Sequence, residues 1–209
     1  ACALKPAHDH SPPSLAYLDR LGRLPRQLVL EVGSGGGLPT EGMAAWGAHV
    51  TGIDMGKAPL PGARLHQHES GLDIDYRQAT AEQLASEDPA GYDIVTCLEM
   101  LEHTPDPAAV IDACARLIRD DGCIFLSTIN RNPKSWLFAV VGAEYVLNLL
   151  PRGTHEYARF IRPSEMEAWS RAAGLSLEDL TGMTYNPLTR HYSLGADVSV
   201  NYLACFRHA

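Results

Sequence analysis

The 209-residue chain lacks an apolar run long enough to cross a membrane. Its longest apolar stretch, residues 136–150, is interrupted by Glu144 and Asn148, and a transmembrane helix needs roughly 20 mostly apolar residues. An excess of positive charge is also lacking, because 17 Lys and Arg face 25 Asp and Glu, for a net charge of −8. No nucleic acid is therefore expected as a partner.

Paired cysteines and targeting signals are absent as well. The five cysteines are an odd number and none belongs to a Cys-x-x-Cys pair, which indicates buried free thiols in a reducing compartment. No secretory signal is visible. With 45% hydrophobic and 20% charged residues the chain has enough apolar material for a core, and its length predicts a single domain, residues 1–209.

Segments typical of strands and helices alternate along the first 128 residues. Strands are expected at 27–32, 49–54, 73–78, 92–97 and 123–128, and helices at 38–46, 59–70 and 107–118. This alternation predicts an α/β fold with a parallel sheet. Beyond it we expect an insertion at 130–162, a helix at 163–173 and a closing pair of strands at 175–180 and 198–206.

A cluster of glycines joins the first strand to its helix. Four glycines and Ser34 occupy residues 33–37, and glycines at such a turn let a ligand lie against bare backbone. Asp54 ends the second strand about 20 residues later, where an acid accepts hydrogen bonds from ribose hydroxyls. Together these features indicate a ligand of the adenosine type at this end of the sheet.

The residues around the loop distinguish between adenosine ligands. The dinucleotide fingerprint G-x-G-x-x-G begins with Gly33 and Gly35 but meets Leu38 where its third glycine belongs. Glu31 enters the loop from the strand, and an acid there repels a phosphate but suits the sulfonium and amino group of S-adenosylmethionine. A dinucleotide oxidoreductase is therefore disfavoured. In the remaining alternative the glycines form only a tight turn and Asp54 is a surface cap.

Motifs spread over most of the chain carry a family resemblance. They read EVGSGGG at 31–37, TGIDMG at 51–56, TCLEMLEH at 96–103, STINRN at 127–132, VVGAEY at 140–145 and GTHE at 153–156. With YNP at 185–187 and VNY at 200–202, they resemble the ubiquinone-biosynthesis O-methyltransferases, class I S-adenosylmethionine-dependent enzymes. The resemblance implies a Rossmann-like fold, with a mostly parallel sheet of seven strands, helices on both faces and an insertion after strand five.

The resemblance also implies which residues bind the cofactor. The expected contacts with S-adenosylmethionine come from Glu31, Gly33, Gly35, Asp54, Met55, Leu98 and, beside the adenine, Ala81 and Glu82. The chain departs from the family pattern at the loop, which begins with Glu31 where Asp is usual. A second departure is Ser14, which stands where the family has an arginine that contacts the cofactor, so anchoring of the cofactor at Ser14 is expected to be weaker.

Glu99, Glu102 and His103 follow the fourth strand, at the end of the sheet where α/β proteins form their sites. Two carboxylates and an imidazole can converge on a hard cation, and the resemblance implies that this set binds Mg²⁺. A cation touching adjacent catechol oxygens favours the phenolate, because a phenol titrates near pH 10. The residues leave two alternatives open: His103 as a general base without a metal, or a purely structural role for all three.

Two further polar residues are candidates for the acceptor side of the site. His155 follows the apolar part of the insertion and is either a second candidate base or a surface histidine. Asn130 follows strand five and either donates a hydrogen bond to the substrate ring or only forms a turn.

Residues 136–150 are too apolar for an ordinary surface helix, and cations flank them at Arg131, Lys134, Arg152, Arg159 and Arg162. Apolar residues beside cations suit an interfacial segment that dips into lipid and places its charges on head groups. We therefore expect a cytoplasmic protein that binds the inner face of the membrane through this insertion. A lid helix that covers the pocket is the alternative, and the two are compatible.

Taken with the resemblance, these features predict an O-methyltransferase for phenolic hydroxyls of polyprenylated catechol and demethylubiquinol intermediates, with a ubiquinone-biosynthesis complex as a further partner. One rival hypothesis is a methyltransferase for another small phenol or acid. Another is a non-catalytic lipid-binding or assembly protein with the same fold, which the change at Ser14 keeps open.

Overall fold

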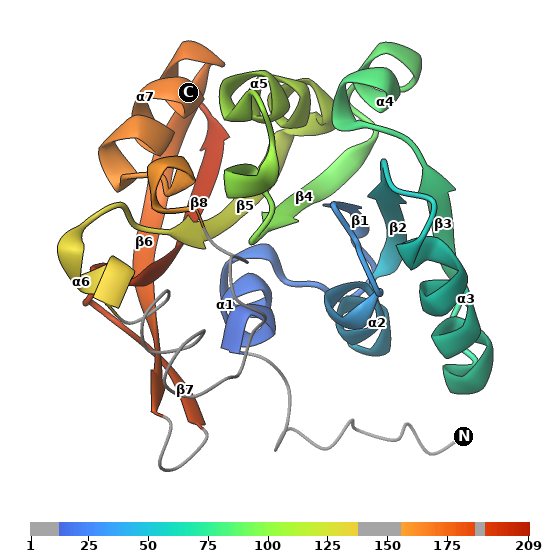
Figure 1. The fold of residues 1–209 in the computed structure, drawn as a ribbon. Helices are drawn as coiled ribbons and strands as arrows, with labels where there is room; N and C mark the ends of the chain where they lie inside the picture. Colours follow the sequence, from blue (N-terminus) through green and yellow to red (C-terminus); the bar gives the residue numbers. More distant parts are fainter. Residues whose placement is uncertain (1–12, 138–155, 187–190) are drawn as a thin grey trace.

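Among the described residues, eight strands form one sheet, and helices cover both of its faces (Figure 1). The computed structural model describes residues 13–137, 156–186 and 191–209. Across the sheet the strands follow the order β3-β2-β1-β4-β5-β8-β6-β7. Their bounds are β1 Leu28–Val32, β2 His49–Asp54, β3 Ile74–Gln78, β4 Tyr92–Leu98, β5 Ile118–Ile129, β6 Leu175–Asn186, β7 His191–Gly195 and β8 Asn201–His208.

The sheet is parallel from β3 to β5 and antiparallel from β5 to β7. This confirms the predicted α/β architecture, and the expected closing pair of strands is β6 and β8. The sheet has eight strands instead of the expected seven. The difference arises because β6 continues past residue 180, and its end pairs with an additional antiparallel strand, β7.

The described helices lie close to their expected positions. Their bounds are α1 Pro13–Gly22, α2 Leu38–Ala45, α3 Pro59–Ser70, α4 Ala81–Glu87, α5 Pro107–Leu117, α6 Pro133–Ser135 and α7 Pro163–Ala172, with 3-10 turns η1 Leu101–His103 and η3 Tyr157–Arg159. Helix α4 was not expected, yet its start carries a capping box. The Thr80 hydroxyl accepts a hydrogen bond from Gln83 N at 3.3 Å, and Gln83 Oε1 accepts one from Thr80 N at 3.0 Å.

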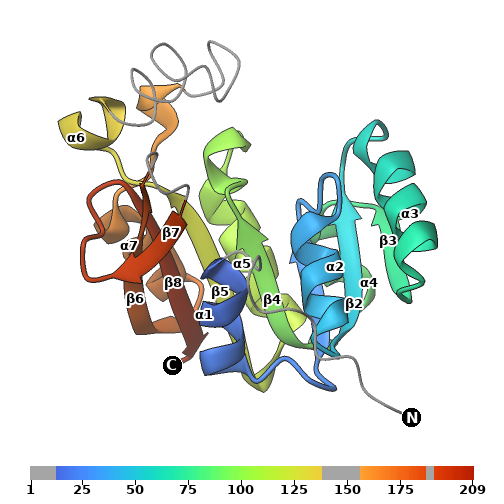
Figure 2. The ribbon, with the colours of Figure 1, turned by 90° about the horizontal axis from the view of Figure 1, so that it is seen from below.

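Buried apolar side chains form two cores, one on each face of the sheet (Figures 1 and 2). Helices α1, α2 and α3 pack on one side around Phe125 and Leu203, which we call the α1 face. Helices α4, α5 and α7 pack on the other side around Leu126 and Tyr202, which we call the α5 face. Consecutive residues of a strand point to opposite faces, so neighbours along β5 belong to different cores. The described cysteines are buried free thiols, as predicted: Cys97, Cys114, Cys123 and Cys205.

The segment between β7 and β8 lies directly against β6 at Gly182. A Cβ atom on Gly182 would overlap the backbone carbonyl of Asp197 and would lie 3.0 Å from Val198 N. A backbone atom cannot move aside as a flexible side chain can, so glycine is required at this position. The close approach holds residues 197–200, which lead into β8, against the sheet.

We predict that Gly182→Ala lowers the free energy of unfolding by about 1–3 kcal/mol, because the added methyl group overlaps backbone. Gly62→Ala is the matched control, since a Cβ there meets no atom within 4 Å. Because Gly62 lies in α3, that variant is expected to be neutral or to gain up to about 1 kcal/mol through helix propensity. Urea unfolding measures both, and equal stabilities of the two variants would contradict the close approach.

Candidate active site

The glycine cluster forms the loop between β1 and α2 and is fixed to the end of β2. The backbone N–H groups of Gly33 and Ser34 both donate to Ile53 O at 2.9 Å. Gly33, Gly35 and Gly37 have φ of 78°, 50° and 85°, a region that glycine adopts without a steric penalty. The sequence therefore needs its glycines here for the backbone conformation itself, and the tight-turn part of the alternative interpretation is correct.

Asp54 holds the glycine loop and the loop after β2 at the same time. Its Oδ2 accepts a hydrogen bond from Gly35 N at 3.0 Å, and its Oδ1 accepts one from Gly56 N at 2.7 Å. A carboxylate has about four acceptor positions, so each oxygen keeps capacity for a further donor such as a ribose hydroxyl. Asp54 thus does more than cap the surface, since it joins two loops.

The backbone at the tip of the loop is open to approach. A Cβ atom on Gly36 would meet nothing within 4 Å, and one on Gly35 would meet only Gly33 O, at 4.0 Å. Met55, next to Asp54, is 76% exposed and offers an apolar surface there. These features suit the adenosine part of S-adenosylmethionine.

The other predicted cofactor residues lie at neighbouring ends of elements. Leu98 ends β4 and is half-buried. Ala81 is buried in the first turn of α4, and Glu82 beside it is half-buried. Ser14 is half-buried in the first turn of α1. The residue after it, Leu15, packs close to Gly42 of α2.

Glu31 is buried beneath the loop and does not present a free charge to it. Only 2% of Glu31 is exposed, and its Oε2 accepts a hydrogen bond from Thr40 Oγ1 in α2. Burial raises the pKa of Glu31 to about 8, although the hydrogen bonds from Thr40 lower it. The carboxyl therefore carries a proton near neutral pH. In this structure the Glu31 carboxyl joins the end of β1 to α2 through Thr40, and its contact with the cofactor stays a prediction.

Glu99 has an unusual backbone conformation immediately after β4. Its φ is 51°, in the left-handed region, which costs a residue other than glycine on the order of 1–3 kcal/mol. Its N–H donates to Ser127 O at 3.1 Å and to Ser127 Oγ at 3.0 Å, and these bonds offset the strain. Burial of the Glu99 carboxyl by the surrounding protein raises its pKa, and the charge of Glu102 raises it further. The residue as a whole is nevertheless exposed.

Glu99, Glu102 and His103 are not grouped around one point in this structure, and their role as metal ligands stays a prediction. Thr128 Oγ1 donates to Glu102 Oε2 at 2.7 Å, whereas Ser127 Oγ donates to Glu99 Oε1 at 2.9 Å. Ser127 and Thr128 are consecutive residues of β5, so they hold the two acids on opposite faces of the sheet. His103 is exposed on η1. Throughout the described ranges, no three His, Cys, Asp or Glu side chains are grouped to bind a metal.

Asn130 forms hydrogen bonds within the protein. Its Nδ2 donates to Val198 O at 2.9 Å, and its backbone N–H donates to Val200 O at 2.7 Å. Two residues on, Asn132 Nδ2 donates to Ser199 O at 2.6 Å. These contacts favour the structural alternative for Asn130, because its amide donor already fastens the start of the insertion to the segment before β8.

Most of the described cations that were expected to face lipid are paired with acids. Arg131 pairs with Glu165, Lys134 with Asp197 at 2.7 Å, and Arg159 with Glu156 at 2.9 Å. Lys134 and Ser199 lower the pKa of Asp197 to about 2.

The predictions for Arg152, His155 and most of residues 136–150 lie outside the described residues. In the ranges that the structure covers, no helix is both long and apolar enough to span a bilayer.

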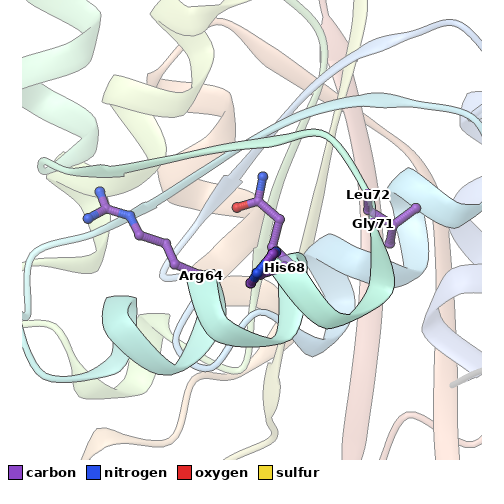
Figure 3. Close-up of a pocket in the computed structure, with 5 residues that line it drawn as sticks. Arg64, His68, Gly71 and Leu72 are labelled. Atoms are coloured by element: carbon purple, nitrogen blue, oxygen red, sulfur yellow. The ribbon is translucent and has the colours of Figure 1, made fainter.

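A surface pocket of about 430 Å³ lies away from these residues (Figure 3). Arg64 and His68 project from α3, and Gly71 and Leu72 follow in the turn to β3. The pocket therefore lies at the amino-terminal end of β3, whereas the candidate site lies at the carboxyl ends of the strands. Arg64 already donates to Tyr76 O at 2.9 Å, so the pocket does not offer a free guanidinium group.

Sequence comparison finds relatives with high identity, of which two serve as examples. A ubiquinone biosynthesis O-methyltransferase of Pseudomonas aeruginosa is 62% identical over 199 residues, which cover 95% of this chain and 86% of the relative. One from Pseudomonas syringae pv. tomato is 61% identical with the same coverage. A family model described as a methyltransferase domain matches residues 30–126.

Solved structures support the fold. Magnesium protoporphyrin IX methyltransferase from Synechocystis with bound SAH is 21% identical and has a TM-score of 0.68, covering 94% of this chain and 80% of that one. A Burkholderia thailandensis 1,6-didemethyltoxoflavin-N1-methyltransferase is 19% identical with a TM-score of 0.64, covering 94% and 77%. Both align with nearly the whole of this chain.

We predict that Glu31→Gln makes stability less dependent on pH. With a folded pKa of about 8 and an ordinary value of 4.5, the folded chain keeps a proton that the unfolded chain releases. Stability therefore falls as pH rises from about 4.5 to about 8, by up to about 1.4 kcal/mol per pH unit. Urea unfolding from pH 5 to pH 8 measures the slope. Glu87→Gln, at an exposed position of α4, is the control and should keep the wild-type slope.

Proposed function

The chain belongs to the ubiquinone biosynthesis O-methyltransferase family, and from this premise we propose that it transfers a methyl group from S-adenosylmethionine to phenolic oxygens of polyprenylated intermediates of ubiquinone biosynthesis. The observation that carries the proposal is the glycine loop tied to Asp54, in a chain that is 62% identical to such an enzyme over 95% of its length.

The proposed reaction requires orientation and the removal of one proton. When bound, S-adenosylmethionine supplies a methyl group activated by its sulfonium. The acceptor oxygen forms the new O–C bond as the S–C bond breaks, and the electron pair of that bond stays on sulfur. The chain's own residues must hold the oxygen in line and accept its proton, because a phenol keeps its proton at neutral pH. The loop and Asp54 hold the donor side.

His103 is the described candidate for the proton acceptor. It is exposed on η1, directly after Glu102, and imidazole titrates near neutral pH. His155 remains a second candidate from the sequence. No step is assigned to Mg²⁺, because Glu99 and Glu102 bind different hydroxyls of β5 and the described residues hold no group of three His, Cys, Asp or Glu side chains.

Peripheral contact with a membrane is a second part of the proposal. Trp136, Leu137 and Tyr157 border the part of the insertion that lies outside the described residues, and they are 45%, 53% and 37% exposed. Exposed aromatic and aliphatic side chains favour the interface of a bilayer, where a polyprenylated acceptor resides. Because Arg131, Lys134 and Arg159 are paired with acids, we assign this contact to apolar side chains rather than to charge. Assembly into a ubiquinone-biosynthesis complex is proposed from the family alone.

We predict methyl transfer to a prenylated catechol that is faster than transfer to the same catechol without the prenyl group. Radiolabelled methyl transfer measures both rates. The same rate is expected in EDTA and in Mg²⁺, because the described acids do not converge.

His103→Ala is expected to lower the rate by about 10²–10⁴, the usual contribution of a general base. His68→Ala, on the exposed surface of α3, is the control.

The rival hypotheses give different results in this assay. Activity only on acceptors without a prenyl chain would favour a methyltransferase for another small phenol or acid. No calorimetric binding of S-adenosylmethionine would favour the lipid-binding or assembly protein. Loss of activity in EDTA that Mg²⁺ restores would return Glu99, Glu102 and His103 to the role of metal ligands.

We predict that the protein co-sediments with phosphatidylglycerol vesicles and that changing both Trp136→Ser and Leu137→Ser weakens this binding about tenfold or more. Each side chain removes apolar area from water when it enters the interface. The control is Leu65→Ser, which changes a leucine that is 57% exposed on α3. A wild-type protein that stays in the supernatant would refute the membrane contact and leave the methyl-transfer proposal unaffected.

A further inference from the structure

The carboxyl group of Glu99 is held by side chains from two strands that are distant in the sequence. Ser127 Oγ of β5 donates to Glu99 Oε1 at 2.9 Å, and Asn201 Nδ2 of β8 lies 3.4 Å from Glu99 Oε2. The same Ser127 hydroxyl accepts a hydrogen bond from Glu99 N at 3.0 Å. Both carboxylate oxygens and the backbone of one strained residue are therefore fixed in place.

Strand pairing explains why the two donors meet. Ile129 of β5 lies opposite Asn201 of β8 in the antiparallel ladder, and Ser127 is two residues before Ile129. Residues two apart on a strand point to the same face, so Ser127 and Asn201 both project on the α1 face. The pairing thus makes a cradle for one carboxylate at the end of the sheet.

This cradle lies beside the glycine loop. Met100, the residue after Glu99, packs so close to the loop that a Cβ on Gly33 would lie 2.6 Å from its Cγ. Glu99 therefore directly precedes a residue that contacts the loop proposed to bind the methyl donor. Its oxygens have further acceptor capacity beyond the bonds to Ser127 and Asn201.

We propose that Ser127 and Asn201 are positioning residues for methyl transfer, and that they hold the Glu99 carboxylate where it accepts a hydrogen bond from the hydroxyl of the methyl acceptor. This inference rests on the proposed function, since it concerns the acceptor of that same reaction. It deepens the proposal by assigning the acceptor side of the site to β4, β5 and β8, whereas the cofactor side belongs to β1 and β2.

Asn201 gives the sharper test of the two residues. Ser127 supports both the backbone and the carboxylate of Glu99, so Ser127→Ala can change the fold locally. The side chain of Asn201 binds Glu99 through its carboxyl group and not through its backbone. Asn201 is half-buried at the start of a long strand. Its removal should leave the backbone of Glu99 as it is.

We expect Asn201→Ala to lower kcat by up to about tenfold, the usual effect of a lost hydrogen bond. The Kd for S-adenosylhomocysteine and the melting temperature should stay at their wild-type values. Asn201→Asp should lower kcat further, because it places a second carboxylate next to Glu99, and Asn201→Gln should recover part of the activity. Ser176→Ala, on the exposed side of β6, is the control for a strand serine.

A double-mutant cycle separates positioning from a general structural role. If Asn201 acts through Glu99, Asn201→Ala should have no further effect on kcat in the Glu99→Ala protein. An additive loss, or an unchanged kcat of Asn201→Ala in an active protein, overturns the inference alone. A wild-type protein that methylates no phenolic acceptor overturns the proposed function and this inference together.

Discussion

The pair of hydrogen bonds that Asp54 accepts is the interaction on which the rest of the site depends. One carboxylate receives the N–H groups of Gly35 and Gly56, and so the loops after β1 and β2 keep one fixed separation. Without it the glycine loop would be fastened to β2 only through Ile53 O. A buried and protonated Glu31 supports the loop from below through Thr40. The cofactor side is thus built from backbone conformation and two acids, of which Glu31 carries a proton.

The acceptor side follows a different principle, the alternation of side chains along a strand. Ser127 and Thr128 are neighbours in β5 and therefore direct Glu99 and Glu102 to opposite faces. Glu102 is buried on the α5 face, whereas Glu99 stays accessible next to the loop. Two acids that are three residues apart in the sequence consequently have different environments, and only one of them can meet an acceptor.

Local patterns were enough to predict most of the fold. The bounds of β2 and α3 agree with those expected from the sequence, because alternating apolar residues and a proline start mark them clearly. Strand β7 could not be foreseen, since it depends on pairing with the end of β6. The capping box at Thr80 and Gln83 is the local sequence signal for the start of α4.

The site was predictable in its residue types but not in its contacts. The glycines and Asp54 have a fixed spacing, so their proximity followed from the sequence. The environment of Glu31 did not, because its burial depends on how α2 packs over β1. The roles of Ser127 and Asn201 were missed, although both belong to motifs that carry the family resemblance, since their convergence on Glu99 requires the pairing of β5 with β8.

The adjacency of Ser127 and Thr128 also limits how this chain can evolve. Inserting or deleting a single residue within β5 would exchange the partners of Glu99 and Glu102 and would move the shifted core side chains of that strand from one buried face of the sheet to the other. A length change within this one strand is therefore expected to disturb both cores and the candidate site together.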